Sequence, residues 1–256
     1  MARVLITGAS RGIGRATVIA LASRGHDVIA TARNPQALAG LPVSSALQLD
    51  VTDQSSVDAA IAAAGEVDAV VSNAGATVRG VVEAIPMSEF HRMMDLNFYG
   101  ALRVIKAVLP AMRARGSGHV VFVSSIAGRI AIPGGSAYAA SKFALEATAE
   151  ALAMETATFG LRVNIIEPGP VATDGPSSAA RYDSPSEYTT ESSVTNYLAA
   201  AGVIAAAEVA SAVADALGNR KTPLRVPVGQ AANQMLAAAP AATTSDPFDS
   251  PPLKEF

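Results

Sequence analysis

The feature that most constrains the fold is the alternation of short apolar runs with longer helical patterns. The predicted strands are RVLIT (3–7), DVIATA (27–32), ALQLDV (46–51), DAVVSN (68–73), HVVFVSS (119–125), RVNIIEP (162–168) and PLRVPV (223–228). Helical patterns lie between them near residues 12–23, 53–64, 88–115, 137–159 and 206–219. Several runs are apolar at successive positions, which is typical of strands covered by helices on both faces. We therefore predict an α/β fold with a doubly wound parallel sheet of Rossmann type, in three αβα layers.

The alternation extends over most of the chain and favours a single domain over residues 1–238. Residues 174–197 are polar and lack apolar periodicity, so we expect a substrate loop or lid over 174–204, because long irregular connections are often binding loops. Residues 239–256 are rich in proline, serine and threonine and are predicted to form a flexible tail.

Composition excludes several classes of function. Half of the 256 residues are hydrophobic and the net charge is -3, without the basic excess of a nucleic-acid binder. No cysteine is present and the three histidines lack ligand spacing, so no metal site is expected. No apolar run is long enough to span a membrane and no signal segment opens the sequence, which predicts a cytoplasmic protein.

The stretch TGASRGIG follows the first predicted strand and opens the first predicted helix. Its glycines permit a tight turn and close approach of a pyrophosphate at the helix amino terminus. The G-K-[ST] ending of a nucleoside-triphosphate loop is missing. A purely structural turn is the alternative. The candidate cofactor-binding residues of this stretch are Gly8, Ser10, Arg11, Gly12, Ile13 and Gly14.

The end of the second strand reads ATARN and carries no carboxylate. An acidic residue there would bind the ribose 2′-hydroxyl of NAD, whereas arginine accommodates a 2′-phosphate. Arg33 stands at this position and Arg11 lies in the glycine loop, so two guanidinium groups can hold one phosphate. Each arginine alone would be interpreted as solvated. Together they predict NADP(H) rather than NAD(H).

Two further strand ends fall where the adenosine of such a cofactor would lie. Asp50 and Val51 follow the third strand, and SNAG supplies Asn73, Ala74 and Gly75 after the fourth. An aspartate in such a place is often only a helix cap. Its position beside the expected adenine favours binding.

The predicted helix over 88–115 carries an amide on its apolar stripe. Phe90, Met94, Ala101 and Ile105 recur at three- and four-residue steps, and Asn97 lies among them. A buried amide without partners costs about 1–3 kcal/mol, so a hydrogen-bond partner is expected. A core contact to a neighbouring carbonyl and a role in a functional site both remain open.

Tyr138 and Lys142 share one face of the helix predicted over 137–159, because they are four residues apart. A tyrosine has a pKa of about 10, which must fall by about 3 units before it acts as a base near neutrality. A cation about 4 Å away supplies the roughly 4 kcal/mol required. In isolation such a pair is more often solvated. The preceding strand delivers Ser124 and Ser125 to the same edge of the sheet, and neither a G-x-S-x-G elbow nor an aspartate-histidine pair supports a serine hydrolase.

Taken in order, TGASRGIG, SNAG, Asn97, SSIAG, YAASK and EPGPVAT resemble the single-domain short-chain dehydrogenases/reductases over residues 3 to 229. The resemblance implies an oxidoreductase that acts on CH–OH or C=O groups with a nicotinamide cofactor. It implies a homodimer or homotetramer, joined through the helices at 88–115 and 137–159. Its substrate would be a small carbonyl or alcohol compound. Tyr182, Tyr188 and Tyr197 in the loop hint at a lipophilic or cyclic substrate.

The resemblance also implies roles for individual residues. Tyr138 would be the general acid or base, Lys142 would lower its pKa and hold the nicotinamide ribose, Ser125 would bind the substrate oxygen, and Asn97 would hold a relay water. Asn73 would line the cofactor channel. The segment with Pro168, Gly169, Val171 and Thr173 would cradle the nicotinamide.

Two other functions fit parts of the pattern. A non-catalytic NADP(H)-binding regulator on the same fold typically loses the tyrosine or the lysine, and both are present here. An epimerase or dehydratase acting on nucleotide sugars usually needs a larger carboxyl-terminal domain than the chain after residue 170 provides.

Overall fold

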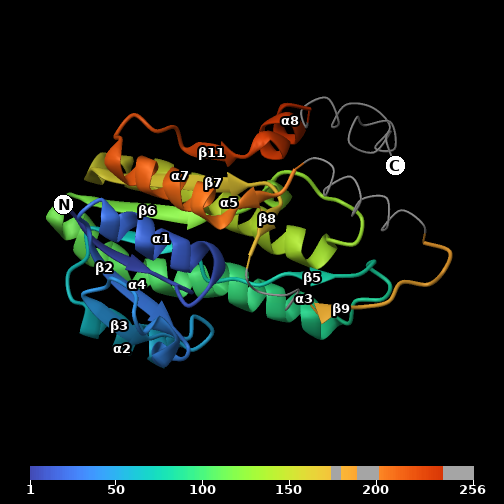
Figure 1. Cartoon of the computed structure of the whole chain (residues 1–256), viewed down its shortest axis with the longest axis horizontal. Coiled ribbons are helices and arrows are strands. Elements are labelled where there is room, and N and C mark those ends of the chain that lie inside the picture. The colour runs from blue at the N-terminus through green and yellow to red at the C-terminus, as the bar shows by residue number, and fades with distance from the viewer. Residues whose placement is uncertain (174–179, 189–201, 239–256) are drawn as a thin grey trace.

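The computed structural model describes residues 1–173, 180–188 and 202–238. Seven parallel strands form one sheet in the order β11-β7-β6-β4-β1-β2-β3 (Figure 1). The strands are β1 (Arg3–Ile6), β2 (Asp27–Ala32), β3 (Ser45–Gln48), β4 (Ala69–Ser72), β6 (Gly118–Val123), β7 (Leu161–Pro168) and β11 (Arg225–Val228). All seven coincide with predicted strands, which confirms the doubly wound parallel sheet.

Helices cover both faces of this sheet, which confirms the three-layer architecture. The helices are α1 (Gly12–Ser23), α2 (Gln54–Ala64), α3 (Met87–Met93), α4 (Gly100–Arg115), α5 (Ser136–Thr156), α7 (Ala206–Gly218) and α8 (Gln230–Ala238). One apolar core lies between the sheet and α2, α4 and α5, and includes Leu5, Val70 and Phe122. A second core, with Ile6 and Val71, lies between the other face and α1 and α7. Successive residues of β1 and β4 therefore point into different cores, which explains their uninterrupted apolar runs.

The helix predicted over 88–115 is not regular. A π-helical segment, Met94–Tyr99, separates α3 from α4. The fully buried methionine before Asn97 is therefore Met93, and Met94, which was predicted to lie on the buried stripe, stays partly exposed. The extra residue per turn changes the register of the helix, and such π segments occur frequently at functional sites.

Short elements lie at both edges of the sheet. Single-turn 3-10 helices lie at Pro35–Leu38, Ile126–Gly128 and Ala157–Phe159. The two-residue strands β5 (Val78–Arg79) and β9 (Ala180–Arg181) pair with each other, as do β8 (Val171–Ala172) and β10 (Ile204–Ala205). Of the predicted lid over 174–204, residues 174–179 and 189–201 lie outside the described residues, as does the predicted tail over 239–256.

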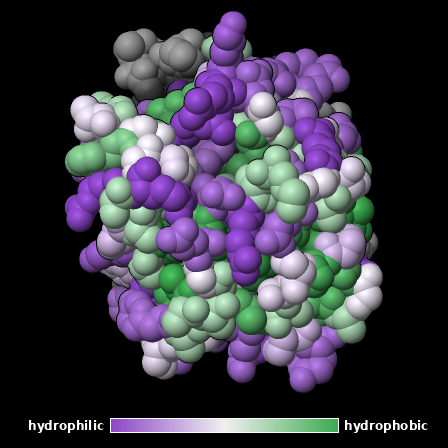
Figure 2. Space-filling model, turned by 90° about the vertical axis from the view of Figure 1, so that its left-hand side faces the viewer, coloured by the Kyte–Doolittle hydropathy of each residue, from purple (hydrophilic) through white to green (hydrophobic). Residues whose placement is uncertain are grey.

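The side of the molecule that carries the N-terminus presents hydrophilic residues interspersed with small hydrophobic areas (Figure 2). Within the described ranges, no helix is both long and apolar enough to cross a membrane.

Candidate active site

The glycine loop joins β1 to α1 through a turn that larger residues cannot form. Gly8 and Gly12 have φ angles of +67° and +53°, a region that favours glycine. A Cβ atom at Gly8 would lie 2.8 Å from the Cα of Ala74, and one at Gly14 would lie 2.3 Å from the carbonyl oxygen of Gly8. The loop is therefore packed tightly against the end of β4, and its backbone is exposed to the cleft in front of it.

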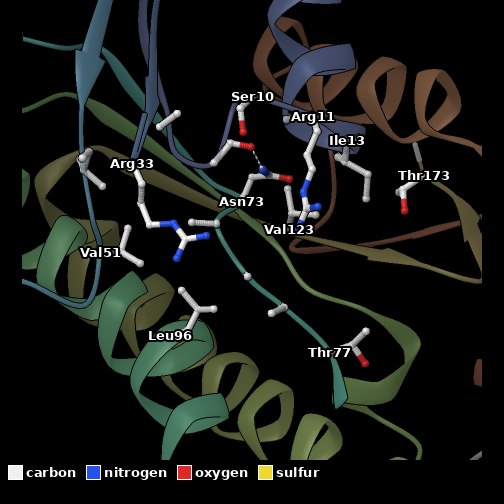
Figure 3. Close-up of a pocket in the computed structure, with 18 of the residues that line it drawn as sticks. Ser10, Arg11, Ile13, Arg33, Val51, Asn73, Thr77, Leu96, Val123 and Thr173 are labelled. Atoms are coloured by element: carbon white, nitrogen blue, oxygen red, sulfur yellow. Dashed lines mark hydrogen bonds between the residues drawn. The ribbon is translucent and has the colours of Figure 1, made fainter. Parts of the chain in front are cut away.

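Asn73 holds this loop in place. Its Nδ2 donates hydrogen bonds to the carbonyl oxygens of Thr7 at 2.9 Å and Gly8 at 3.1 Å, and the second of these is the dashed line in Figure 3. The Thr7 hydroxyl in turn accepts from the backbone N–H groups of Asn73 and Ala74, each at 3.0 Å. Asn73 thus supports the loop as well as lining the cleft.

A cleft of about 520 Å³ opens along the edge of the sheet where the strands end. Its predicted members are Gly8, Ser10, Arg11, Gly12, Ile13, Gly14, Arg33, Asp50, Val51, Asn73, Ala74, Gly75, Tyr138, Lys142 and Thr173. The lining also includes residues that were not predicted as site residues: Ala32, Leu49, Ala76, Thr77, Arg92, Leu96, Val123 and Ser124, the neighbour of Ser125. Five predicted residues do not line it: Asn97, Ser125, Pro168, Gly169 and Val171.

Three of the five residues outside the lining lie at the end of β7 or in the segment that follows it, where they take part in backbone pairing or end the strand. The backbone N–H of Gly169 donates to the carbonyl oxygen of Val228, and Val171 belongs to the small β8–β10 pair. Pro168 is the last residue of β7. Of the segment predicted to cradle the nicotinamide, Thr173 is the residue that reaches the cleft.

Arg11 and Arg33 enter the cleft from different elements, the glycine loop and the end of β2 (Figure 3). Asp50 also reaches it, but one of its carboxylate oxygens accepts from the N–H of Thr52 at 2.9 Å and from its hydroxyl at 2.7 Å. That oxygen stabilises the turn before α2, whereas the N-cap of α2 is Asp53. Positive charge therefore predominates in this part of the cleft.

The other end of the cleft is formed by α5. Tyr138 and Lys142 lie on one face of this helix, and the Lys142 Nζ atom is 5.9 Å from the centroid of the Tyr138 ring. Nζ donates a hydrogen bond to the carbonyl oxygen of Val123 at 2.9 Å, which fixes the lysine against the end of β6. The predicted pair therefore forms and faces the same cleft as the glycine loop.

The electrostatics of this pair differ from the expectation. Dense surroundings raise the pKa of Tyr138, although part of the residue is exposed; a hydrogen bond with Ser125 and the charge of Arg79 act in the opposite direction. Burial lowers the pKa of Lys142 to about 8. The groups that favour the tyrosinate are thus Ser125 and Arg79 rather than Lys142. Arg79 carries no motif, and only the fold brings it near the tyrosine.

Asn97 is buried, as predicted, and its amide is used within the protein. Oδ1 accepts from the N–H of Ala76 at 2.9 Å, while Nδ2 donates to the Ala76 carbonyl and to the Ser141 hydroxyl, each at 2.9 Å. The side chain therefore joins the strand end after β4 to α5 between Tyr138 and Lys142. Its position in a π-helical segment gives the backbone there a register that differs from that of an α-helix.

Three of the eight lining residues that were not predicted lie close in sequence or space to predicted ones. Leu96 precedes Asn97, Thr77 follows the SNAG segment, and Arg92 lies on α3, where Glu89 pairs with it at 2.6 Å. Their proximity to predicted residues was the only sequence signal. Among the described residues, no group of His, Cys, Asp or Glu side chains gathers as a metal site would require.

The fold and the cleft together define a dinucleotide-binding α/β protein, with a glycine loop at a helix amino terminus and the cleft at the carboxyl ends of parallel strands. Comparison with known proteins makes the assignment more specific. The family model described as short chain dehydrogenase matches residues 2–182. The chain belongs to the short-chain dehydrogenase family, whose members are oxidoreductases that act on alcohol and carbonyl groups of small molecules and bind a nicotinamide cofactor.

Individual relatives agree with this assignment. Oxidoreductase BOA17 of Botryotinia fuckeliana is 36% identical over 243 residues, which cover 88% of this chain and 87% of that protein. Human retinol dehydrogenase 8 is 39% identical over 184 residues, or 67% of this chain and 59% of that protein. A short-chain dehydrogenase structure from Streptomyces avermitilis has a TM-score of 0.86 at 38% identity, and one from Burkholderia cenocepacia, in complex with NADP, has 0.77 at 28%; each covers 94% of both chains.

Proposed function

We propose that the protein is an NADP(H)-dependent oxidoreductase that transfers a hydride between the nicotinamide and a carbonyl or secondary alcohol, with Tyr138 as the general acid or base. The observation that carries the proposal is that Tyr138 and Lys142 line the same cleft as the glycine loop. A cofactor held by the loop would extend along the cleft towards this pair. The cofactor, when bound, supplies or accepts the hydride.

The residues at the tyrosine end have complementary tasks. In reduction, the Tyr138 hydroxyl donates a proton to the substrate oxygen, and in oxidation the tyrosinate accepts it. Ser125, which hydrogen-bonds Tyr138, orients the same substrate oxygen. Ser125 and the charge of Arg79 favour the tyrosinate, and Lys142 as an ammonium binds the ribose hydroxyls of the cofactor. The carbonyl groups of the π-helical segment around Asn97, rather than its occupied amide, are suited to hold a relay water.

The cleft also supports the preference for NADP(H). Backbone packed too tightly for side chains at Gly8 and Gly14 fits a pyrophosphate, and the charges of Arg11 and Arg33 fit a 2′-phosphate at the end of β2. The similar structure from Burkholderia cenocepacia is a complex with NADP, which agrees with this preference.

The two described tyrosines of the predicted substrate loop do not line the cleft, so the proposal of a lipophilic substrate rests on the relatives. Tyr182 packs beside Val78 and Met93 in a small apolar cluster, while the Tyr188 hydroxyl donates to Glu83 at 2.7 Å. Tyr197 lies outside the described residues. Retinol dehydrogenase 8 is named for a lipophilic alcohol. We propose a carbonyl or alcohol compound with an apolar body as the substrate.

We also propose that the protein forms a homodimer or homotetramer through α4 and α5. Large hydrophobic residues are exposed on and beside these helices: Tyr99, Phe143, Met154 and Phe159. Exposed apolar side chains mark a subunit interface where they form a contiguous patch, and these four are the candidates for one.

The cofactor preference is tested by titrating the protein with NADPH and NADH and following nicotinamide fluorescence. We expect tighter binding of NADPH, and a loss of about tenfold in NADPH affinity, roughly 1.4 kcal/mol, in Arg33→Ser. NADH affinity is expected to stay unchanged in that variant. Arg15→Ser is the control, since Arg15 is exposed on α1 outside the cleft lining. Equal affinity for the two cofactors would refute the preference.

Turnover separates the proposed enzyme from a non-catalytic NADP(H)-binding regulator. A panel of aldehydes and ketones, followed by the absorbance of NADPH, is expected to include substrates that consume the cofactor. Tight NADPH binding without consumption across the panel would favour the regulator.

A further inference from the structure

Glu146 is a buried polar residue of α5 that the proposed reaction does not use. It lies four residues after Lys142, and its Oε1 accepts a hydrogen bond from the Ser124 hydroxyl at 2.7 Å. The same helix face holds the two neighbours of that serine: Val123 accepts from Lys142, and Ser125 hydrogen-bonds the tyrosine. Three consecutive residues at the end of β6 are thus held by three side chains spaced four residues apart on one helix.

The contact between Ser124 and Glu146 is closely enclosed. A Cβ atom at Gly128 would lie 2.4 Å from Glu146 Oε1 and 2.9 Å from the Ser124 hydroxyl. Glu146 is 2% exposed. The chain after β6 therefore turns around this contact, and its geometry determines where the next residue, Ser125, is placed.

Behind the contact lies a cluster of charged residues from four elements. Arg225 of β11 binds Glu146 Oε2, Glu167 of β7 at 2.7 Å and Glu150 of α5 at 2.7 Å. Arg129, after the 3-10 helix at 126–128, lies 3.5 Å from Glu167. The second carboxylate oxygen of Glu167 is buried and has no hydrogen-bond partner in the described part of the chain. Two buried carboxylates thus share one guanidinium nitrogen.

Burial among these charges changes the pKa of Glu146 and of Lys142 in opposite directions. Burial raises the pKa of Glu146 to about 7, and the charge of Glu167 adds to this rise, while Ser124 and Arg225 oppose it. Burial lowers the pKa of Lys142 to about 8, and the carboxylate of Glu146 acts in the opposite direction. Glu146 and Lys142 are therefore two buried groups on one helix face, and the carboxylate of Glu146 favours the protonated form of Lys142.

We propose that Glu146 is a positioning residue of this active site. It holds Ser124, and with it the serine that faces the tyrosine, and it supplies the counter-charge that keeps Lys142 a cation. The inference rests on the proposed function, because it assigns Glu146 a part in a reaction carried out by Tyr138 and Lys142.

The test compares Glu146→Gln with Ser124→Ala by measuring kcat and KM from neutral to alkaline pH. Glutamine keeps an oxygen that accepts from Ser124 but removes the charge, so the fall of kcat with rising pH should begin at lower pH. At pH 8 we expect kcat to drop about threefold or more, because less Lys142 is protonated. Ser124→Ala removes the hydrogen bond alone. It is expected to lower kcat at every pH without changing the pH at which kcat begins to fall, which is the alkaline limb of the profile.

Glu150→Gln is the matched control. Glu150 lies on the same helix and pairs with the same arginine, but its side chain is 47% exposed and it does not contact Ser124. We expect its pH profile to match that of the unchanged protein. Thermal melting of each variant identifies any loss of folding, in which case Ser124→Ala alone decides whether the contact affects kcat.

The outcomes distinguish this inference from the function on which it rests. If Tyr138→Phe abolishes turnover but Glu146→Gln keeps the unchanged pH limb and Ser124→Ala keeps full kcat, the positioning role is wrong and the proposed function stands. If Tyr138→Phe retains full turnover, both are wrong. A pH limb displaced in Glu146→Gln and not in Glu150→Gln supports the role.

Discussion

The two ends of β6 both bury polar groups against β7, but they do so in different ways. At its amino end, His119 is 4% exposed, and its Nε2 lies 2.7 Å from Asn164 Oδ1. Its Nδ1 accepts from Arg162 at 2.8 Å. Burial, assisted by the charge of Arg162, lowers the pKa of His119 to about 4, so the ring is neutral near pH 7.

At the carboxyl end of the same strand, charge is retained inside the protein. Lys142, Glu146 and Glu167 are all at most 5% exposed, and one oxygen of Glu167 lacks a partner among the described residues. A neutral ring whose two nitrogens both have hydrogen-bond partners is typical of a stabilising contact. Buried charges that are incompletely paired cost stability and are typical of functional sites. The difference agrees with the proposal that the chemistry takes place at the carboxyl end of the strand.

The largest expected effect is at the carboxyl end. Arg225→Met leaves Glu146 and Glu167 buried without their shared cation and is expected to lower the free energy of unfolding by about 3–5 kcal/mol near pH 7. The loss should become smaller at lower pH, as Glu146, whose pKa burial raises, takes up a proton. Urea denaturation at the two pH values measures it.

Arg24→Met is the control for this change. Arg24 pairs with Asp215 at 2.7 Å, but the two side chains are 38% and 65% exposed, so the expected loss is at most about 1 kcal/mol. Equal losses of unfolding free energy in the two variants would show that the buried cluster around Arg225 contributes no more to stability than an exposed ion pair.

The amino end is expected to show its effect through acid sensitivity. An unfolded histidine binds a proton near pH 6.5, whereas folded His119 does so near pH 4. The unfolded state therefore binds more protons between these values, and stability falls as the pH is lowered through them, by up to about 3 kcal/mol. Unfolding measured across this range should lose most of that slope in His119→Gln.

His91→Gln controls for the loss of a histidine as such, because His91 is exposed on α3. Its pH dependence should follow that of the unchanged protein. If His119→Gln behaves in the same way, the histidine at the amino end does not contribute to acid sensitivity and the contrast between the two ends fails.

The sequence predicted the fold well because the signal for each strand is local. All seven strands of the main sheet were found, since apolar runs of this kind form wherever both faces are covered. The π-helical segment Met94–Tyr99 was missed because it shifts the helix register by only one residue. Such a shift does not visibly disturb the three- and four-residue spacing of apolar residues in the sequence. The helix Gln230–Ala238 was also missed, although Ala232 and Met235 supply a short buried face.

The site was predicted unevenly, for a related physical reason. Residues in contiguous motifs, such as the glycine loop and the Tyr138–Lys142 pair, were found and line one cleft. Arg79 acts on Tyr138 only through tertiary packing, so the sequence pattern did not indicate it. Glu146 continues the four-residue spacing of the pair, yet its partner Arg225 is 79 residues away along the chain.

The most direct test of the account is Tyr138→Phe, with NADPH binding and turnover measured on the same preparation. The account predicts an NADPH Kd close to that of the unchanged protein and a kcat lower by about 10²–10⁴, the range for loss of a general acid or base. Turnover at near the full rate would contradict the assignment of Tyr138 and with it the location of the chemistry at this end of the cleft.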